Sequence, residues 1–280
     1  MTRSSFAFLL AAGMLSAVAV PAQAHRVWLQ PSATTFSGTD AWVTVDAAES
    51  TDVFYADHRG IGFDRVKVWA PDGSEGQVQN GANGHVRSTF DVQLDKPGTW
   101  RIGVENDRVF GTFKVNGEEW RIGGRGPARG ASAKTVASVA DIPAGATDVK
   151  LTESSSRNSV FVTTGTPTKA VFEPTGKGLE MVPITHPDDL VSDEEASFRY
   201  LIDGKPAAGL QVTILPAGKR YIEGRDQIDL TTGADGVLKI KWPRAGMYWV
   251  SASTSDQHPS EPRASERRMS YTMTVDVLAP

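Results

Sequence analysis

The sequence predicts an all-β protein built of two β-sandwiches in tandem, and three observations support this fold class. Short segments in which apolar and polar residues alternate recur along the chain, separated by clusters of glycine, proline, asparagine and aspartate. The first half contains no stretch of helical periodicity. The 280 residues include no cysteine, so hydrophobic cores have to stabilise the fold without disulfides.

Residues 1–24 have the order of a secretory signal peptide. Arg3 is followed by an apolar run over residues 6–20 and then by the small-residue triplet Ala22-Gln23-Ala24. The apolar run is too short to cross a bilayer unaided. We expect cleavage after Ala24, which leaves a periplasmic chain of 280 − 24 = 256 residues that begins with His25.

Charge and composition argue against several function classes. Arg3 is the only charged residue of the signal, so the mature chain carries 29 − 1 = 28 basic and 33 acidic side chains, a balance of −5. This mild charge, without clusters of Lys and Arg, argues against nucleic-acid binding. The sequence has no second long apolar segment, so we do not expect the mature chain to insert into a membrane. The lack of cysteine excludes thiolate metal ligands and a cysteine nucleophile.

Residues 25–116 are expected to form the N-terminal β-sandwich. The clearest strand covers residues 88–94, where Phe90, Val92 and Leu94 share one face. Pro71-Asp72-Gly73 is typical of a turn between two strands. The other strands expected in this part cover residues 27–29, 41–45, 53–55, 66–69, 100–104 and 111–115.

Residues 117–177 are expected to form an irregular excursion followed by connecting strands. The segment 123–130 is rich in glycine, proline and arginine, which indicates a long loop. The elements expected after this loop are a helical turn at residues 132–140 and strands at 148–152, 160–163 and 169–172.

Residues 178–280 are expected to form the C-terminal β-sandwich. Asp203-Gly204 and Asp235-Gly236 are typical of hairpin turns. The strands expected in this part cover residues 178–184, 196–202, 210–214, 237–242, 247–252 and 269–275.

The first candidate functional residue is His25. An N-terminal histidine offers its α-amine and its imidazole to the same ion, and such a nitrogen chelate suits Cu²⁺ or Ni²⁺. A site that uses a histidine at the third position is excluded, because Val27 stands there. The alternative is that an ordinary residue follows the cleavage site.

A second imidazole would complete the site, and the sequence offers two main candidates. His58 follows Asp57, which could be a ligand or could accept a hydrogen bond from one. His186 stands in an acidic turn at the expected domain junction. The alternative for both is a structural histidine in a turn, and His85 and His258 are expected to be plain surface residues.

Motifs of enzymes are missing from the sequence. It contains no Gly-x-Ser-x-Gly elbow, no Walker-type glycine loop and no His-Glu-x-x-His segment. The acidic group at residues 188–195 is typical of a solvated loop, and most of the seven tryptophans fall in strand patterns and are expected in the cores. We therefore do not expect an enzyme.

Four parts of the sequence are similar to those of one family. They are residues 178–190, residues 203–212, Asp235-Gly236 together with residues 246–249, and Ala24-His25 followed by Trp28-Leu29. Together they resemble the DUF4198 family of exported proteins. The resemblance implies an immunoglobulin-like C-terminal sandwich, no enzymatic activity, and a loose association with periplasmic components of cobalt and nickel uptake.

The expected function is therefore that of a periplasmic, non-enzymatic protein that handles or takes up a metal. The ion would be Cu, Ni or Co, the ligands His25, His58 and His186, and the partner an inner- or outer-membrane transport component. One alternative is a scaffold or adhesion module that binds an envelope protein and no metal. A more distant alternative is a copper-dependent oxidative enzyme that uses the same N-terminal chelate.

Overall fold

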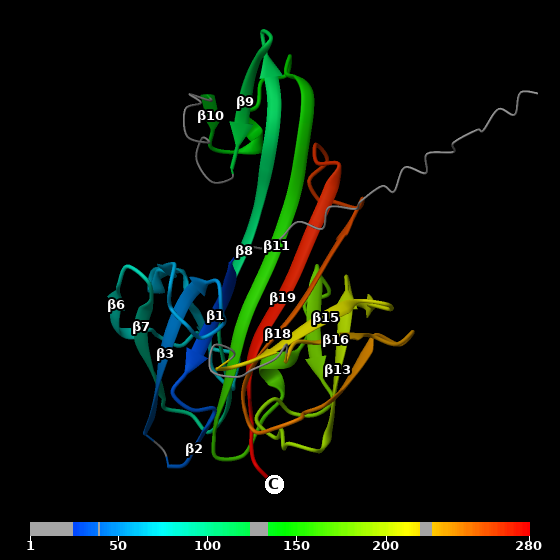
Figure 1. Cartoon of the computed structure of the whole chain (residues 1–280). Helices are drawn as coiled ribbons and strands as arrows, with labels where there is room; N and C mark the ends of the chain where they lie inside the picture. Colours follow the sequence, from blue (N-terminus) through cyan, green and yellow to red (C-terminus); the bar gives the residue numbers. More distant parts are fainter. Residues whose placement is uncertain (1–24, 39, 124–133, 219–225) are drawn as a thin grey trace, which may run out of the picture.

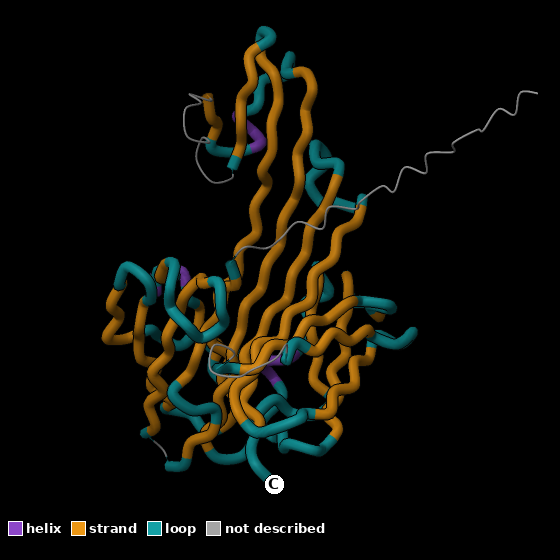
Figure 2. The backbone as a smooth tube through the Cα atoms, in the orientation of Figure 1, coloured by secondary structure: helices purple, strands orange, loops and turns teal. Residues whose placement is uncertain are grey.

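The structure is a computed structural model that describes residues 25–38, 40–123, 134–218 and 226–280. These residues form three β-sheets with short 3₁₀ turns and no α-helix, which confirms the predicted all-β class. Figure 2 shows how completely strands dominate the described backbone. The predicted signal peptide lies outside the described residues. Within the described part, no helix has the length and apolar character to cross a membrane.

A ten-stranded sheet forms the spine of the molecule. Its central strands are β8 (Gly98–Val115), β11 (Thr147–Thr164), β19 (Glu266–Val277) and β18 (Gly246–Asp256). Strand β11 pairs antiparallel with β8 along one edge and parallel with β19 along the other. The upper parts of β8 and β11 rise above the body as a long arm (Figure 1).

Six shorter strands complete the large sheet. They are β2 (Thr35–Phe36), β5 (Lys67–Trp69), β9 (Glu118–Ile122), β10 (Lys134–Val136), β15 (Gln211–Pro216) and β16 (Ile228–Thr231). The sheet runs in the order β10-β9-β8-β11-β19-β18-β15-β16, with β5 pairing to β8 and β2 to β11 outside this path.

A five-stranded sheet covers one face of the spine and completes an N-terminal sandwich. It contains β1 (Arg26–Pro31), β3 (Ala41–Ser50), β4 (Arg59–Gly60), β6 (Gln79–Asn83) and β7 (Ser88–Leu94). The predicted alternation holds on β7, where Phe90, Val92 and Leu94 are fully buried. They pack with residues of β3, β8 and β11, among them Val45, Trp100, Ile102, Val160 and Val162.

A four-stranded sheet covers the other face of the spine near its C-terminal strands. It contains β12 (Leu179–Pro183), β13 (Glu195–Ile202), β14 (Lys205–Pro206) and β17 (Val237–Lys241). Its core joins Phe198, Tyr200 and Trp242 to Tyr248 and Met273 of β18 and β19. Burial of such large apolar side chains supplies most of the driving force for folding.

The two sandwiches share the spine. Val160 and Val162 of β11 lie in the N-terminal core, whereas Phe161 between them lies in the C-terminal core. One sheet thus runs through the segments 25–116, 117–177 and 178–280. Strand pairing alone does not separate them, and the predicted division into two tandem immunoglobulin-like domains stays a prediction.

Several predicted elements of the middle of the chain differ from the structure. The strands expected at 148–152 and 160–163 are both parts of the single strand β11. The sequence did not show this continuity because the residues between them are polar. The strand expected at 169–172 is a 3₁₀ turn, η3 (Ala170–Phe172), which buries Phe172 against Phe161. No strand forms at 53–55, where Phe54 has a φ of 61° that is incompatible with a strand.

The end of the arm has a small core of its own. Phe113, Ile122, Ile142 and Leu151 are buried together there, although the sequence predicted an irregular excursion. The remaining 3₁₀ turns are η1 (Phe63–Arg65) and η2 (Val139–Asp141). η2 overlaps only the end of the helical turn expected at residues 132–140, where Lys134–Val136 instead forms strand β10.

The arm depends on close backbone contact at Gly111. This residue has a φ of 153°, and a Cβ on it would lie 2.0 Å from the carbonyl oxygen of Lys150 on β11. We expect Gly111→Ala to lower the free energy of unfolding by about 2 kcal/mol or more, measured by urea denaturation.

The matched control for this change is Gly145→Ala. A Cβ at Gly145 has no neighbour within 4 Å, so this variant should be close to the wild type in stability. Equal stability of the two variants would contradict the packing of β8 against β11.

Candidate metal site

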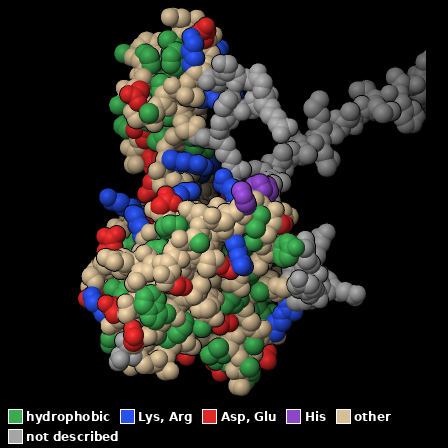
Figure 3. Space-filling view, turned by 90° about the vertical axis from the view of Figure 1, so that its left-hand side faces the viewer, with side chains coloured by type: hydrophobic (Ala, Val, Ile, Leu, Met, Phe, Trp, Pro, Cys, Tyr) green, Lys and Arg blue, Asp and Glu red, His purple; other side chains and the backbone are tan. Residues whose placement is uncertain are grey.

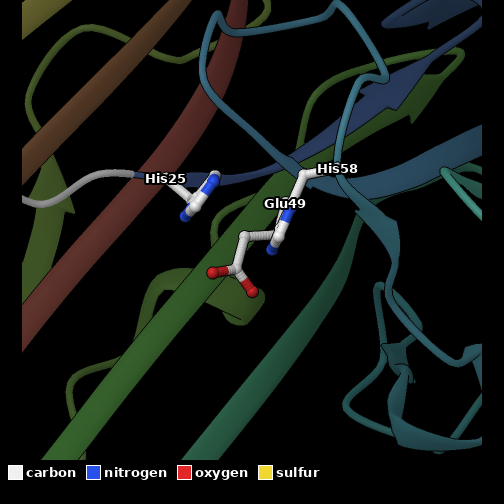
Figure 4. A group of neighbouring side chains, drawn as sticks. All are labelled: His25, Glu49 and His58. Atoms are coloured by element: carbon white, nitrogen blue, oxygen red, sulfur yellow. The ribbon is translucent and has the colours of Figure 1, made fainter.

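Strand pairing brings His25 and His58 together at one end of β3. Arg26, which follows His25, pairs with Ser50, and Arg59, which follows His58, pairs with Glu49. Strands β1 and β4 therefore approach the same end of β3. The two imidazole rings stack there, with centroids 3.8 Å apart and ring planes 14° from parallel (Figure 4).

Glu49 is the third member of this group. One ligand atom from each of His25, Glu49 and His58 lies within 4.8 Å of the other two. Glu49 is only 4% exposed, whereas His58 is exposed and His25 is half-buried. The group thus combines two accessible imidazoles with a buried carboxylate.

The sequence analysis missed Glu49, although the strand pattern contains a signal for it. Val43, Val45 and Ala47 alternate along β3 and face the N-terminal core. Continued alternation places Glu49 on the same inward face. A carboxylate at an inward position of a regular strand is costly unless it is paired, and this is the signal of a functional or ion-paired residue.

Arg59 holds the carboxylate of Glu49. Its Nε donates a hydrogen bond of 2.6 Å to Oε2 of Glu49, and its Nη2 forms an ion pair with the same oxygen. Asp57, considered above as a possible ligand, instead accepts a hydrogen bond from the backbone N–H of Thr51 at 3.0 Å. Asp57 therefore fixes the loop that carries His58.

Aromatic contacts anchor β1 and hence His25. Trp28 is buried and donates from Nε1 to Oγ of Ser50 at 2.6 Å. Trp249 of β18 donates from Nε1 to the carbonyl oxygen of Val27 at 2.9 Å. Trp28 and Trp249 share a small apolar cluster with Leu215, so the start of β1 is fixed against the spine. A site on such anchored strands is better defined than one on a free terminus.

The donor set fits a transition metal. Two ligands at about 2.0–2.1 Å from an ion lie at most about 4.2 Å apart, so the group has to contract only slightly. Each imidazole binds a metal in its own ring plane, so the stacked rings would also have to turn apart. The exposure of His58 leaves room for this turn. Nitrogen ligands with one carboxylate oxygen suit Cu²⁺, Ni²⁺ or Zn²⁺.

Histidine side chains are visible on the surface where the arm rises from the body, next to several Lys and Arg side chains (Figure 3). His85 and His258 are exposed as expected. Neither belongs to the group of His25, Glu49 and His58.

His186 is the predicted ligand that the structure does not bring to this group. Its Nδ1 accepts a hydrogen bond from the backbone N–H of Asp188 at 3.1 Å, which places the ring proton on Nε2, 3.0 Å from Oγ1 of Thr99. Thr99 contacts Thr163 at 2.9 Å, and Thr163 donates to Asp188 at 2.5 Å. Burial lowers the pKa of His186. His186 is thus part of a closed polar network that ties the β12–β13 connection to the spine.

The family model described as "Domain of unknown function (DUF4198)" matches residues 22–256. The chain belongs to this family, as its sequence motifs predicted. No curated protein matches the chain.

Solved structures resemble the chain only distantly. The D0-D1 domain of intimin is 11% identical with a TM-score of 0.23, and the match covers 89% of this chain and 97% of that one. A DUF4785 family protein from Legionella pneumophila subsp. pneumophila str. Philadelphia 1 is 8% identical with a TM-score of 0.26, covering 83% and 53%. Trypsin-activated alpha-2-macroglobulin from Escherichia coli is 14% identical with a TM-score of 0.23, covering 89% and 15%. These scores are too low to support an argument about function.

The network of His186 makes stability depend on pH through Asp188. Burial raises the pKa of Asp188 to about 7, the hydrogen bond from Thr163 opposes the shift, and the nearby Asp276 adds to it. The unfolded chain ionises this group near pH 4, whereas the folded protein keeps it protonated up to about pH 7. A rise in pH across this window therefore favours unfolding through Asp188, by at most about 4 kcal/mol.

Replacement of Asp188 by Asn should remove this contribution. The free energy of unfolding of Asp188→Asn, measured by urea denaturation relative to the wild type, should increase between about pH 4 and pH 7 and then level off. A difference between the two proteins that does not vary with pH would contradict the assignment.

Proposed function

We propose that this protein is a non-enzymatic periplasmic metal-handling protein that binds a transition metal ion through His25, His58 and Glu49. The observation that carries the proposal is the convergence of two histidines and a buried carboxylate from separate segments of the chain, with ligand atoms within 4.8 Å of one another. Histidine nitrogens and carboxylate oxygens are both established ligands of transition metals in proteins.

The proposed export of the chain adds a fourth ligand. If cleavage follows Ala24, the α-amine of His25 is free, and amine and imidazole of one residue can chelate a single ion. His58 would add the second imidazole and Glu49 an oxygen. Three nitrogens and one oxygen suit the tetragonal geometry of Cu²⁺ or Ni²⁺. The family resemblance implied a loose association with cobalt and nickel uptake.

Arg59 has a supporting role in this proposal. Its hydrogen bond to Glu49 keeps the carboxylate in one orientation and balances its charge before the metal binds. On binding, the ion would share Glu49 with Arg59. Such a site holds its ion through few ligands, one of them the exposed His58, which suits delivery to or acceptance from a transport component in the inner or outer membrane.

Calorimetric titration of the chain that begins at His25 tests the proposal. We expect one equivalent of Cu²⁺ or Ni²⁺ to bind, and one additional residue before His25 to weaken the binding because it separates the amine from the ring. Residues that only hold a metal ligand in place contribute roughly 10–100-fold to metal affinity. Removal of a direct ligand should cost at least as much, so we expect His58→Ala and Glu49→Gln each to weaken metal binding by at least about tenfold.

His258→Ala and His186→Ala are the matched controls, because each removes a histidine that lies outside the group. Both should leave the affinity unchanged. Binding that ignores the added residue and the His58 change, or no binding at all, would overturn the proposal and favour the scaffold or adhesion module. Sustained redox turnover of the copper form would instead favour the oxidative enzyme.

A further inference from the structure

A cleft of about 690 Å³ lies on the spine. Its floor is formed by residues of β8, β11 and β19, and its walls by the start of β12, the β13–β14 turn and the loop between β18 and β19. Arg157 on this floor pairs in register with Tyr271, which belongs to the C-terminal core. None of His25, Glu49 and His58 lines this cleft, so the two features are built from different residues.

Arg157 is in an unusual state for a nearly buried charge. Its side chain is only 13% exposed, yet its buried Nη1 has no hydrogen-bond partner among the residues that the structure describes. The nearest carboxylate oxygen, on Asp107, lies 3.8 Å from Nη1, which is beyond hydrogen-bond distance. A desolvated guanidinium with unused N–H groups is costly for the folded protein.

Two of the neighbouring charges of the cleft, Arg267 and Glu153, are already paired. Arg267 donates to Asp203 at 2.8 and 3.0 Å and to Asp256 at 2.6 and 3.1 Å. Glu153 accepts hydrogen bonds from Ser260 and from the backbone N–H of Glu261. These pairs leave two guanidinium groups without a hydrogen-bonded partner among the described lining residues: Arg157 on the floor, and Arg108, which lies over the ring of Phe110.

We propose that the cleft binds a small anion through a carboxylate or phosphate group, with Arg157 as the principal donor. The planar guanidinium presents paired N–H groups that match two oxygens of either group. Lys177 lies exposed at the rim and adds a second positive charge. The volume falls in the usual range of small-molecule sites, about 300–1,000 Å³. This proposal does not depend on metal binding at His25.

Thermal unfolding and calorimetry of the metal-free mature protein test it. Inorganic phosphate and citrate are the probes, each at an ionic strength held constant with chloride. We expect saturable binding of one equivalent and a rise in the unfolding midpoint. The tighter of the two probes identifies whether the site prefers phosphate or carboxylate.

Arg157→Met should weaken this binding by about tenfold or more, because it removes the donors while keeping most of the volume. Without the anion, this variant should unfold at the same temperature as the wild type or higher, since an unsatisfied buried charge is removed. A purely structural arginine would instead lower the midpoint and leave anion binding intact, and this result would overturn the proposal.

Two further variants complete the experiment. Lys177→Met at the exposed rim should weaken binding without affecting the fold, and it decides the matter if Arg157→Met does not fold. Lys239→Met removes one charge of the exposed ion pair between Lys239 of β17 and Glu195 of β13, neither of which lines the cleft, and should change nothing. No saturable binding of either probe, or equal binding by all variants, would also overturn the proposal.

Discussion

The pairing of β11 along both of its edges is the constraint on which the rest of the structure depends. One edge pairs with β8 over nearly the whole length of both strands, and the other edge pairs with β19, which lies more than a hundred residues later in the chain. Because successive side chains point to opposite faces, this strand supplies Val160 to one core and Phe161 to the other. Both sandwiches are therefore built on the same backbone ladder.

The same principle of pairing at two edges produces the candidate metal site on a smaller scale. Strand β3 holds β1 and β4 at its C-terminal end, and the residue that precedes each of them is a histidine. Trp28 and Trp249 then fix β1 against the spine. The position of the imidazoles follows from ladder geometry, tryptophan anchoring and the hydrogen bond of Asp57 that fixes the loop before β4.

Glu49 and Arg157 are charges at positions where the strand pattern calls for an apolar residue. Glu49 continues the face of Val45 and Ala47, and its charge is balanced by Arg59. Arg157 lies beside Tyr271 without a hydrogen bond to a described residue. Natural strands place a charge at such positions at a cost to stability, and a ligand that pairs with the charge offsets this cost. Both proposals rest on this reasoning.

The sequence by itself determined the all-β class, most of the strands, the family and the choice of His25 and His58, because alternation, turn residues and motifs are local signals. It could not show that β11 is one strand, since Ser154, Ser155 and Ser156 interrupt its apolar pattern. Only the tertiary structure decided that Glu49 joins His25 and His58 and that His186 belongs to a network with Thr99. The physical reason is that register between distant strands is set by the packing of whole faces, and no single segment encodes it.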